Sequence, residues 1–157
     1  MISCNHKKTS VNNYSGYNNC IVVDYSLPSS IKRMFIKIDG IIIDSMLVCS
    51  GRTDNQNKPI FSNVPNSYCS SLGKVEIMYP YVGTFGKAYK LKGLEATNNN
   101  IFIRNIVLHA HSCVPERTTY RICNSEGCFT VNPDAFTRLD NYIQSYDIKH
   151  IYAINGL

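Results

Sequence analysis

The chain has 157 residues, of which 44% are hydrophobic and 17% are charged, and its net charge at pH 7 is +5. This length suits one domain, and no apolar run approaches the roughly 18 residues of a membrane-spanning helix, so we expect no membrane span. The basic residues are scattered along the chain, a pattern typical of a solvated surface, and we expect no nucleic-acid partner.

Residues 1–20 are polar, with asparagines between single tyrosines, and show no period that would bury one face. We therefore expect a loose N-terminal arm, followed by one domain over residues 21–157. The segment from Met1 to Lys8 also lacks the apolar stretch that a signal peptide needs. We expect either that export is not encoded in this chain or that a signal has been removed from it.

A β pattern begins at Ile21. The runs Met34–Asp39 and Ile41–Val48 meet at Asp39-Gly40, a dipeptide typical of a tight hairpin. Further strand-like runs are separated by turns that contain Gly, Pro and Asn, and they cover residues 75–78, 88–91, 101–108, 120–123, 128–131 and 150–154. This spacing predicts a mainly β fold, either a sandwich or a barrel.

One short helix is expected after the strand at residues 128–131. Asn132 is a good N-cap and Pro133 suits the first helical position. Phe136, Leu139 and Ile143 recur at three and four residues, which predicts a buried apolar stripe.

The sequence contains seven cysteines, at Cys4, Cys20, Cys49, Cys69, Cys113, Cys123 and Cys128. This number is high for a cytosolic domain and suits an oxidising compartment. Because seven is odd, three disulfides would leave one thiol, and a leftover thiol in a secreted protein is a candidate reactive group. A wholly reduced set is also compatible with the sequence.

Cys128 and His109 form the first candidate for chemistry. A thiol becomes a nucleophile when an imidazole removes its proton or holds it as an ion pair. Gly127 would allow close approach of a substrate, and the amides around Gly127 and Cys128 would donate to a developing oxyanion. Ser125 would orient a partner or bond its own turn. Many proteins contain a Cys and a His at this separation, so spacing alone does not decide the function.

A second interpretation uses some of the same residues as zinc ligands. His109, His111 and Cys113 alternate and would project from one face of a strand, with Cys123 and Cys128 downstream. This spacing matches no common zinc finger or ribbon. The plainer alternative is a disulfide between Cys113 and Cys123, with His111 in solvent.

Motifs for other chemistries are absent from the sequence. It contains no P-loop, no dinucleotide-binding glycine fingerprint, no His-Glu-x-x-His and no Gly-x-Ser-x-Gly. We therefore expect no cofactor and no resident metal.

Several short motifs follow one another along most of the chain. In order they are Val23-Asp24-Tyr25-Ser26, Pro28-Ser29-Ser30, Lys32-Arg33-Met34-Phe35, Phe61-Ser62-Asn63-Val64-Pro65-Asn66-Ser67, Ser70-Ser71-Leu72-Gly73, Gly93-Leu94-Glu95, Ile106-Val107-Leu108-His109-Ala110 and Ser125-Glu126-Gly127-Cys128. Together they resemble the catalytic domain of murein L,D-transpeptidases, in the YkuD-like subgroup, from about Val22 to Gly156. The last two motifs match the catalytic signature of that family, a strand-borne His followed by Ser-x-Gly-Cys.

The resemblance implies a β-sandwich catalytic domain in which Cys128 is the nucleophile and His109 is its base. Cys128 would attack the carbonyl between the third residue of a peptidoglycan stem, usually meso-diaminopimelate, and D-Ala at position four. D-Ala would leave, and an amine of a second stem would take the acyl group from the thioester to give a 3-3 cross-link. Water or a free D-amino acid as acceptor would give carboxypeptidase or exchange chemistry.

The resemblance also implies roles for the neighbours of this pair. Gly127, Ser125 and Ala110 are expected to shape the site, with the backbone of Ala110 orienting the imidazole. The residues expected to contact the substrate are Asn63, Ser71, His111 and Glu126. The implied partners are peptidoglycan stem peptides, the implied location is the cell envelope, the periplasm or the outside of the cell, and we expect a monomer.

Three positions near the site depart from the family pattern. His109-Ala110 stands where related sequences usually read His-Gly, Glu126 replaces an aromatic residue, and Phe129-Thr130 replaces Pro-Ala. A carboxylate beside the nucleophile would raise the pKa of the thiol if unpaired, and it would alternatively hold the acceptor amine. These departures affect the expected substrate more than the expected chemistry.

Other functions remain open at this level. The same chemistry would serve an L,D-carboxypeptidase. It would also serve an antibacterial effector, which a compact chain without a visible signal suggests. Ala110 and Glu126, together with His111 and Cys113, would also fit a catalytically silent module that binds peptidoglycan or a metal.

Overall fold

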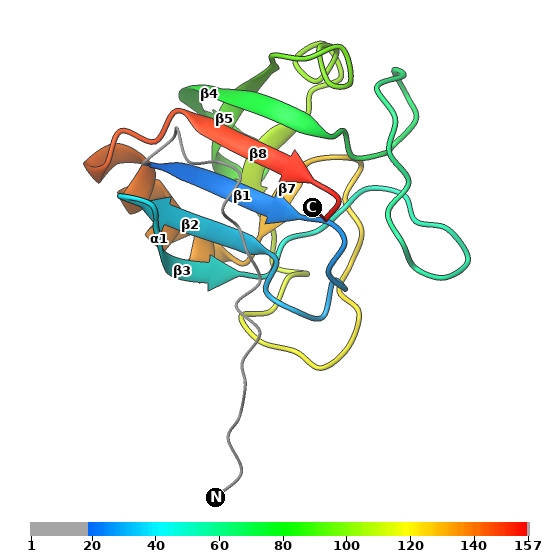
Figure 1. Cartoon of the computed structure of the whole chain (residues 1–157), viewed down its shortest axis with the longest axis horizontal. Coiled ribbons are helices and arrows are strands. Elements are labelled where there is room, and N and C mark those ends of the chain that lie inside the picture. The colour runs from blue at the N-terminus through cyan, green and yellow to red at the C-terminus, as the bar shows by residue number, and fades with distance from the viewer. Residues whose placement is uncertain (1–18, 157) are drawn as a thin grey trace, which may run out of the picture.

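The structure is a computed structural model that describes residues 19–156. The predicted N-terminal arm over residues 1–20 lies almost wholly outside this range, and the first strand already begins at Cys20. The elements are β1 (Cys20–Asp24), β2 (Met34–Ile38), β3 (Ile41–Met46), β4 (Gly73–Gly83), β5 (Gly86–Gly93), β6 (Val107–Ala110), β7 (Phe129–Val131), α1 (Pro133–Ser145) and β8 (His150–Ile154) (Figure 1). Within the described range, no helix is long and apolar enough to cross a membrane.

The strands of the described range form one mixed sheet of eight strands in the order β3-β2-β1-β8-β4-β5-β6-β7. The pairs β1–β8 and β6–β7 are parallel, and the other neighbours are antiparallel. The backbone N–H of Cys49, just after edge strand β3, donates to the carbonyl of Thr130 on edge strand β7 at 2.9 Å. The sheet therefore curls until its two edges meet, and the predicted mainly β fold is confirmed.

Two local predictions are confirmed in detail. The β2–β3 hairpin turns at Asp39 and Gly40, which have φ values of 49° and 77°. Positive φ at both central residues is what a tight hairpin turn of this kind requires. Helix α1 begins after Asn132, whose side chain accepts hydrogen bonds from the backbone N–H groups of Asp134 and Ala135.

The core lies between one face of the sheet and α1. Phe136, Leu139 and Ile143 of the helix belong to the same buried cluster as Leu91 of β5 and Leu108 of β6. The predicted helical stripe is therefore confirmed. Because side chains alternate across a strand, the residues next to Leu108 face away from this core.

One predicted strand is partly wrong and another is wrong. Residues 101–105 form turns, with Asn105 at φ 55°, and the strand there covers only Val107–Ala110. Ile101 and Ile106 are buried, so their apolar character reflects packing of a turn rather than a strand. Residues 120–123 lie in a loop, where Ile122 packs in a small cluster with Leu47, Cys49 and Val114.

Strand β4 is longer than expected, because it continues past residue 78 as far as Gly83. Its pairing with β5 shifts between Ile77 and Pro80. The two strands form a hairpin that closes at Gly83 and Gly86, with Phe85 in its turn.

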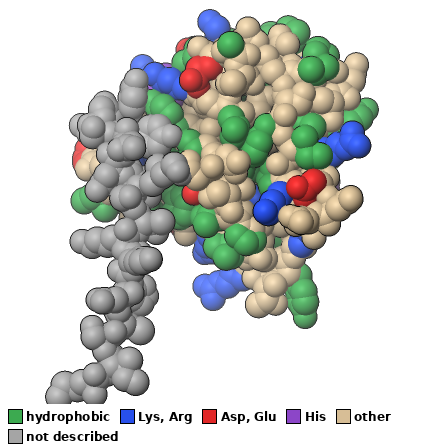
Figure 2. Space-filling model, turned by 45° about the vertical axis from the view of Figure 1, so that its right-hand side comes forward, with side chains coloured by type: hydrophobic (Ala, Val, Ile, Leu, Met, Phe, Trp, Pro, Cys, Tyr) green, Lys and Arg blue, Asp and Glu red, His purple; other side chains and the backbone are tan. Residues whose placement is uncertain are grey.

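Figure 2 shows one face of the molecule, on which the Lys and Arg side chains stand apart instead of gathering in a patch.

Candidate active site

Cys128 lies immediately before β7, on the side of the sheet that faces away from the α1 core. The parallel pair β6–β7 sets Leu108 opposite Phe129 and His109 opposite Thr130. Cys128 and Thr130 are two residues apart, so their side chains project from the same side as that of His109. The Cys128 thiol accepts a hydrogen bond from the backbone N–H of Val107 at 3.4 Å and donates to the carbonyl of Asn105 at 3.6 Å.

The His109 imidazole is held at both ring nitrogens. Its Nδ1 lies 2.9 Å from the carbonyl of Ala110, and its Nε2 lies 3.0 Å from the Thr130 hydroxyl. A carbonyl only accepts, so Nδ1 carries the proton and Nε2 accepts from Thr130 in the neutral ring. The contact with the Ala110 backbone is the one that the resemblance implied.

Burial lowers the pKa of His109 below its usual value of 6.5, although the bond to Ala110 opposes the shift and nearby His111 adds to it. His109 is only 7% exposed. The imidazole is therefore neutral near pH 7, which is the form that can accept a proton.

Burial also raises the pKa of the Cys128 thiol. The bond from Val107 opposes that rise, the charge of Glu126 adds to it, and the charges of Arg104 and Lys90 oppose it. At neutral pH the resting group is therefore a thiol, and attack requires a base. Because the Nε2 of His109 bonds Thr130, this nitrogen has to exchange partners before it can take the proton of Cys128.

Gly127 has a role that other residues cannot fill without strain. Its φ is 110°, and an added Cβ would lie 2.6 Å from the carbonyl oxygen of Cys69. The Ser125 hydroxyl donates to the Cys128 carbonyl at 2.8 Å and accepts from the Gly127 N–H at 3.2 Å. The Ser125 side chain therefore forms hydrogen bonds within the turn at residues 125–128. Together with Gly127 it fixes the backbone conformation that places Cys128.

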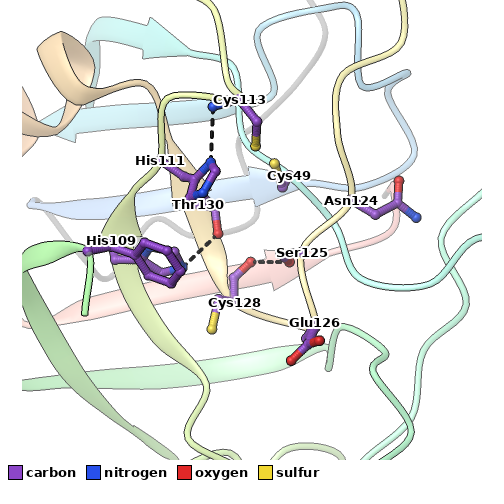
Figure 3. Close-up of a pocket in the computed structure, with 10 residues that line it drawn as sticks. Cys49, His109, His111, Cys113, Asn124, Ser125, Glu126, Cys128 and Thr130 are labelled. Atoms are coloured by element: carbon purple, nitrogen blue, oxygen red, sulfur yellow. Dashed lines mark hydrogen bonds between the residues drawn. The ribbon is translucent and has the colours of Figure 1, made fainter. Parts of the chain in front are cut away.

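Cys128 and His109 line one cavity of about 370 Å³. Phe85 from the β4–β5 turn stacks on the His109 ring, with centroids 5.1 Å apart and planes at 18°, and meets the edge of His111 at 5.0 Å. The cavity lining also includes Cys49, His111, Cys113, Asn124, Ser125, Glu126 and Thr130 (Figure 3). The structure thus brings together Cys128, His109, Ser125, His111 and Glu126 among the residues singled out from the sequence.

Asn63 and Ser71 do not line this cavity. The side chain of Asn63 bonds the carbonyl of Ala96, the side chain of Asn99 and the backbone N–H of Asn100. The Ser71 hydroxyl donates to the carbonyl of Ser62 at 2.9 Å. Both side chains join one loop to another, and their predicted contact with substrate stays a prediction.

Cys113 and Cys123 form a disulfide, as the plainer alternative to a zinc site expected. Two thiols of the proposed ligand set are therefore not available as thiolates. Within residues 19–156, no group of three or more His, Cys, Asp or Glu side chains could hold a metal ion. Cys128 is a free thiol, and Cys49 lies buried with its sulfur 3.5 Å from that of Cys123.

Sequence reasoning missed Thr130 and Phe85 as neighbours of His109. Thr130 was noted only as a departure from the family pattern, and its contact with His109 depends on the register of β6 and β7. Phe85 reaches His109 only because the β4–β5 hairpin extends beyond the predicted strand. Neither contact has a local signal in the sequence.

A free cysteine and a neutral histidine in one cavity of a curled mixed sheet define a candidate site for cysteine-dependent acyl transfer. The sequence pattern of the family described as L,D-transpeptidase catalytic domain matches residues 2–152. The chain therefore belongs to the L,D-transpeptidase catalytic domain family.

Solved structures are similar to this chain at low sequence identity, and the first of those given next shares its fold. An L,D-transpeptidase from Mycobacterium smegmatis is 12% identical with a TM-score of 0.50, over 87% of this chain and 58% of its own. An L,D-transpeptidase from Xylanimonas cellulosilytica is 14% identical with a TM-score of 0.49, over 87% of this chain and 60% of its own. An L,D-transpeptidase in complex with imipenem is 12% identical with a TM-score of 0.48, over 87% of this chain and 59% of its own. This chain spans about three fifths of the length of these proteins. No curated protein matches it.

Proposed function

We propose that this chain is a cysteine L,D-transpeptidase that acts on peptidoglycan stem peptides at the cell envelope. The observation that carries the proposal is the register of β6 and β7, which sets His109 and the free thiol of Cys128 on the same side of two adjacent strands. Membership of the L,D-transpeptidase catalytic domain family supports it.

In the first half-reaction, His109 Nε2 leaves Thr130 and takes the proton of the Cys128 thiol. The thiolate attacks the carbonyl between the third residue of a stem, usually meso-diaminopimelate, and D-Ala at position four. The new C–S bond forms, the C–N bond to D-Ala breaks, and the departing amine takes the proton from the imidazolium. Throughout this exchange the Nδ1–H of His109 keeps its bond to the Ala110 carbonyl, which holds the ring in one orientation.

In the second half-reaction, an acceptor amine attacks the thioester. His109 takes a proton from this amine, the new C–N bond forms, and the C–S bond breaks to return the proton and electron pair to Cys128. An amine of a second stem as acceptor gives a 3-3 cross-link. Water in the same place gives an L,D-carboxypeptidase.

Glu126 suits the acceptor side of this reaction. It lines the cavity with His109 and Cys128, and it has no ion-pair partner within 4.0 Å in the described part of the chain. A carboxylate so placed attracts the ammonium form of an incoming amine. The same charge raises the pKa of Cys128, which increases the need for a base.

The thiol of L,D-transpeptidases is acylated by carbapenems, and this gives a direct test of the nucleophile. Wild-type protein incubated with a carbapenem should gain the mass of one ring-opened molecule, located by peptide mapping on Cys128. Cys128→Ala should show no adduct. Cys20→Ala, which removes a buried thiol of β1 outside the cavity, should acylate like the wild type. Absence of an adduct on the wild type would count against the proposal.

A further inference from the structure

Lys90 lies on the same side of the sheet as Cys128. In the β5–β6 register, Lys90 is opposite Val107, whose backbone N–H bonds the Cys128 thiol. Lys90, Val107 and Cys128 therefore follow one another across three adjacent strands. Since neighbouring strands are about 4.8 Å apart, the backbones of Lys90 and Cys128 are separated by roughly 10 Å, within reach of a lysine side chain plus one amino acid.

The Lys90 ammonium has no acidic partner in the described part of the chain. The ion pairs there involve Lys87, Arg138 and Lys149 as the cations. Lys90 is instead half-buried, with its Nζ 4.4 Å from the centroid of the Tyr81 ring on β4. An aromatic face holds a cation in place without neutralising its charge, so the ammonium can still bind an anion.

Arg104, in the turn before β6, adds a second positive charge near Cys128. Its guanidinium donates only to neutral groups, which are the Ser62 carbonyl, the Ser71 hydroxyl, the Ser67 hydroxyl and the Cys69 carbonyl. The same Cys69 carbonyl packs against Gly127. The charges of Lys90 and Arg104 both act on the Cys128 thiol.

The surroundings of Cys128 are therefore electrically polarised. Lys90 and Arg104 supply positive charge from β5 and from the turn before β6. Glu126 supplies negative charge within the cavity that His109 lines. An amino acid in which the amine is next to a carboxylate has the complementary arrangement of charges.

On the basis of the proposed function, we propose that Lys90 binds the carboxylate next to the reacting amine, so that leaving groups and acceptors are α-amino acids rather than simple amines. The leaving amine and the attacking amine occupy the same place on the acyl carbon, one in each half-reaction. D-Ala carries a carboxylate one carbon from its amine, and so does the D-centre of diaminopimelate. The ε-amine of lysine does not.

Comparison of an acid with its amide tests this assignment. With a tetrapeptide donor, isotopically labelled D-alanine and D-alaninamide are supplied in turn as acceptors, and the ratio of the rates at which they enter the stem, as kcat/KM, is measured. A charged hydrogen bond to the carboxylate should favour D-alanine over D-alaninamide roughly ten- to hundredfold in the wild type. The amide differs in amine basicity, but this difference cancels when the ratio is compared between variants.

Lys90→Met and Lys90→Gln should both reduce the ratio to a few-fold or less, and Lys90→Arg should keep most of it. Lys92→Met is the matched control, because it removes a lysine two residues further along β5, and it should keep the wild-type ratio. A wild type that does not discriminate, or a Lys90→Met variant that keeps the wild-type ratio, would overturn the assignment. A wild type that neither forms the carbapenem adduct nor releases D-Ala would instead remove the proposed function, and this inference with it.

Discussion

The strands β5, β6 and β7 have two faces that differ in what they do. On one face, Leu91, Leu108 and Phe129 are buried in the core that includes α1. On the other face, Lys90 and His109 lie on the same side of the strands as the Cys128 thiol. Because side chains alternate along a strand, each residue of the site is next to a residue of the core. Residues of the core and of the proposed active site are thus separated by one position in the sequence, and substitutions on the two faces should have different effects.

The largest effect on the site face is expected from His109→Asn. Loss of the base should lower kcat for D-Ala release roughly 10²- to 10⁴-fold. The free energy of unfolding, measured with urea, should change less than in Leu108→Ala. Added imidazole should restore part of the rate. A variant that retains most of its activity would show that His109 is not the base.

The largest effect on the core face is expected from Leu108→Ala. Leu108 is fully buried, so its truncation should lower the free energy of unfolding by about 2–5 kcal/mol. Below the denaturation range, the variant should still form the carbapenem adduct on Cys128. Loss of the adduct in a folded Leu108→Ala protein would mean that the two faces are not separable.

Thr130→Val should sharpen the comparison on the site face. The Thr130 hydroxyl occupies the Nε2 of His109, and this bond has to break before proton transfer. Its removal should raise kcat/KM for acylation by about fivefold, as the loss of one hydrogen bond worth about 1 kcal/mol implies. Thr130→Ser should behave like the wild type. A slower Thr130→Val enzyme would indicate that the hydroxyl passes the proton between Cys128 and His109.

The smallest effect is a displacement of the pH profile. Burial lowers the pKa of His109 below 6.5, so His109 stays neutral as the pH falls through 6.5, and the acid limb of kcat/KM should have its midpoint below that value. In the unfolded chain the same histidine takes up a proton near 6.5, so its contribution to stability is lost as the pH falls below 6.5. A midpoint at or above 6.5 would contradict the burial of a neutral base.

The sequence predicted correctly those parts of the fold that are determined by a few neighbouring residues. Asp39-Gly40 predicted the β2–β3 turn because few residues adopt positive φ, and Asn132 predicted the start of α1 because its side chain caps the first turn. Ile101 and Ile122 were misread, since an apolar residue buried in a turn looks like one buried in a strand. The closing of the sheet between Cys49 and Thr130 joins distant residues and leaves no local signal.

The sequence also indicated only part of the candidate site. Ordered motifs pointed to Cys128 and His109, and the resemblance pointed to the Ala110 carbonyl. The stacking of Phe85 and the hydroxyl of Thr130 depend on strand length and register. The positions of the Lys90 and Arg104 charges relative to Cys128 depend on the register of β5 and β6 and on the turn before β6. None of these can be obtained from spacing along the chain.

The most direct test of the central claim is a reaction with purified tetrapeptide muropeptides, with the products analysed by mass. We expect the wild type to release D-Ala and to form 3-3 cross-linked dimers, or tripeptides if water is the acceptor. Cys128→Ala should release none. No D-Ala release from the wild type, or equal release from Cys128→Ala, would contradict the assignment of Cys128 as the nucleophile.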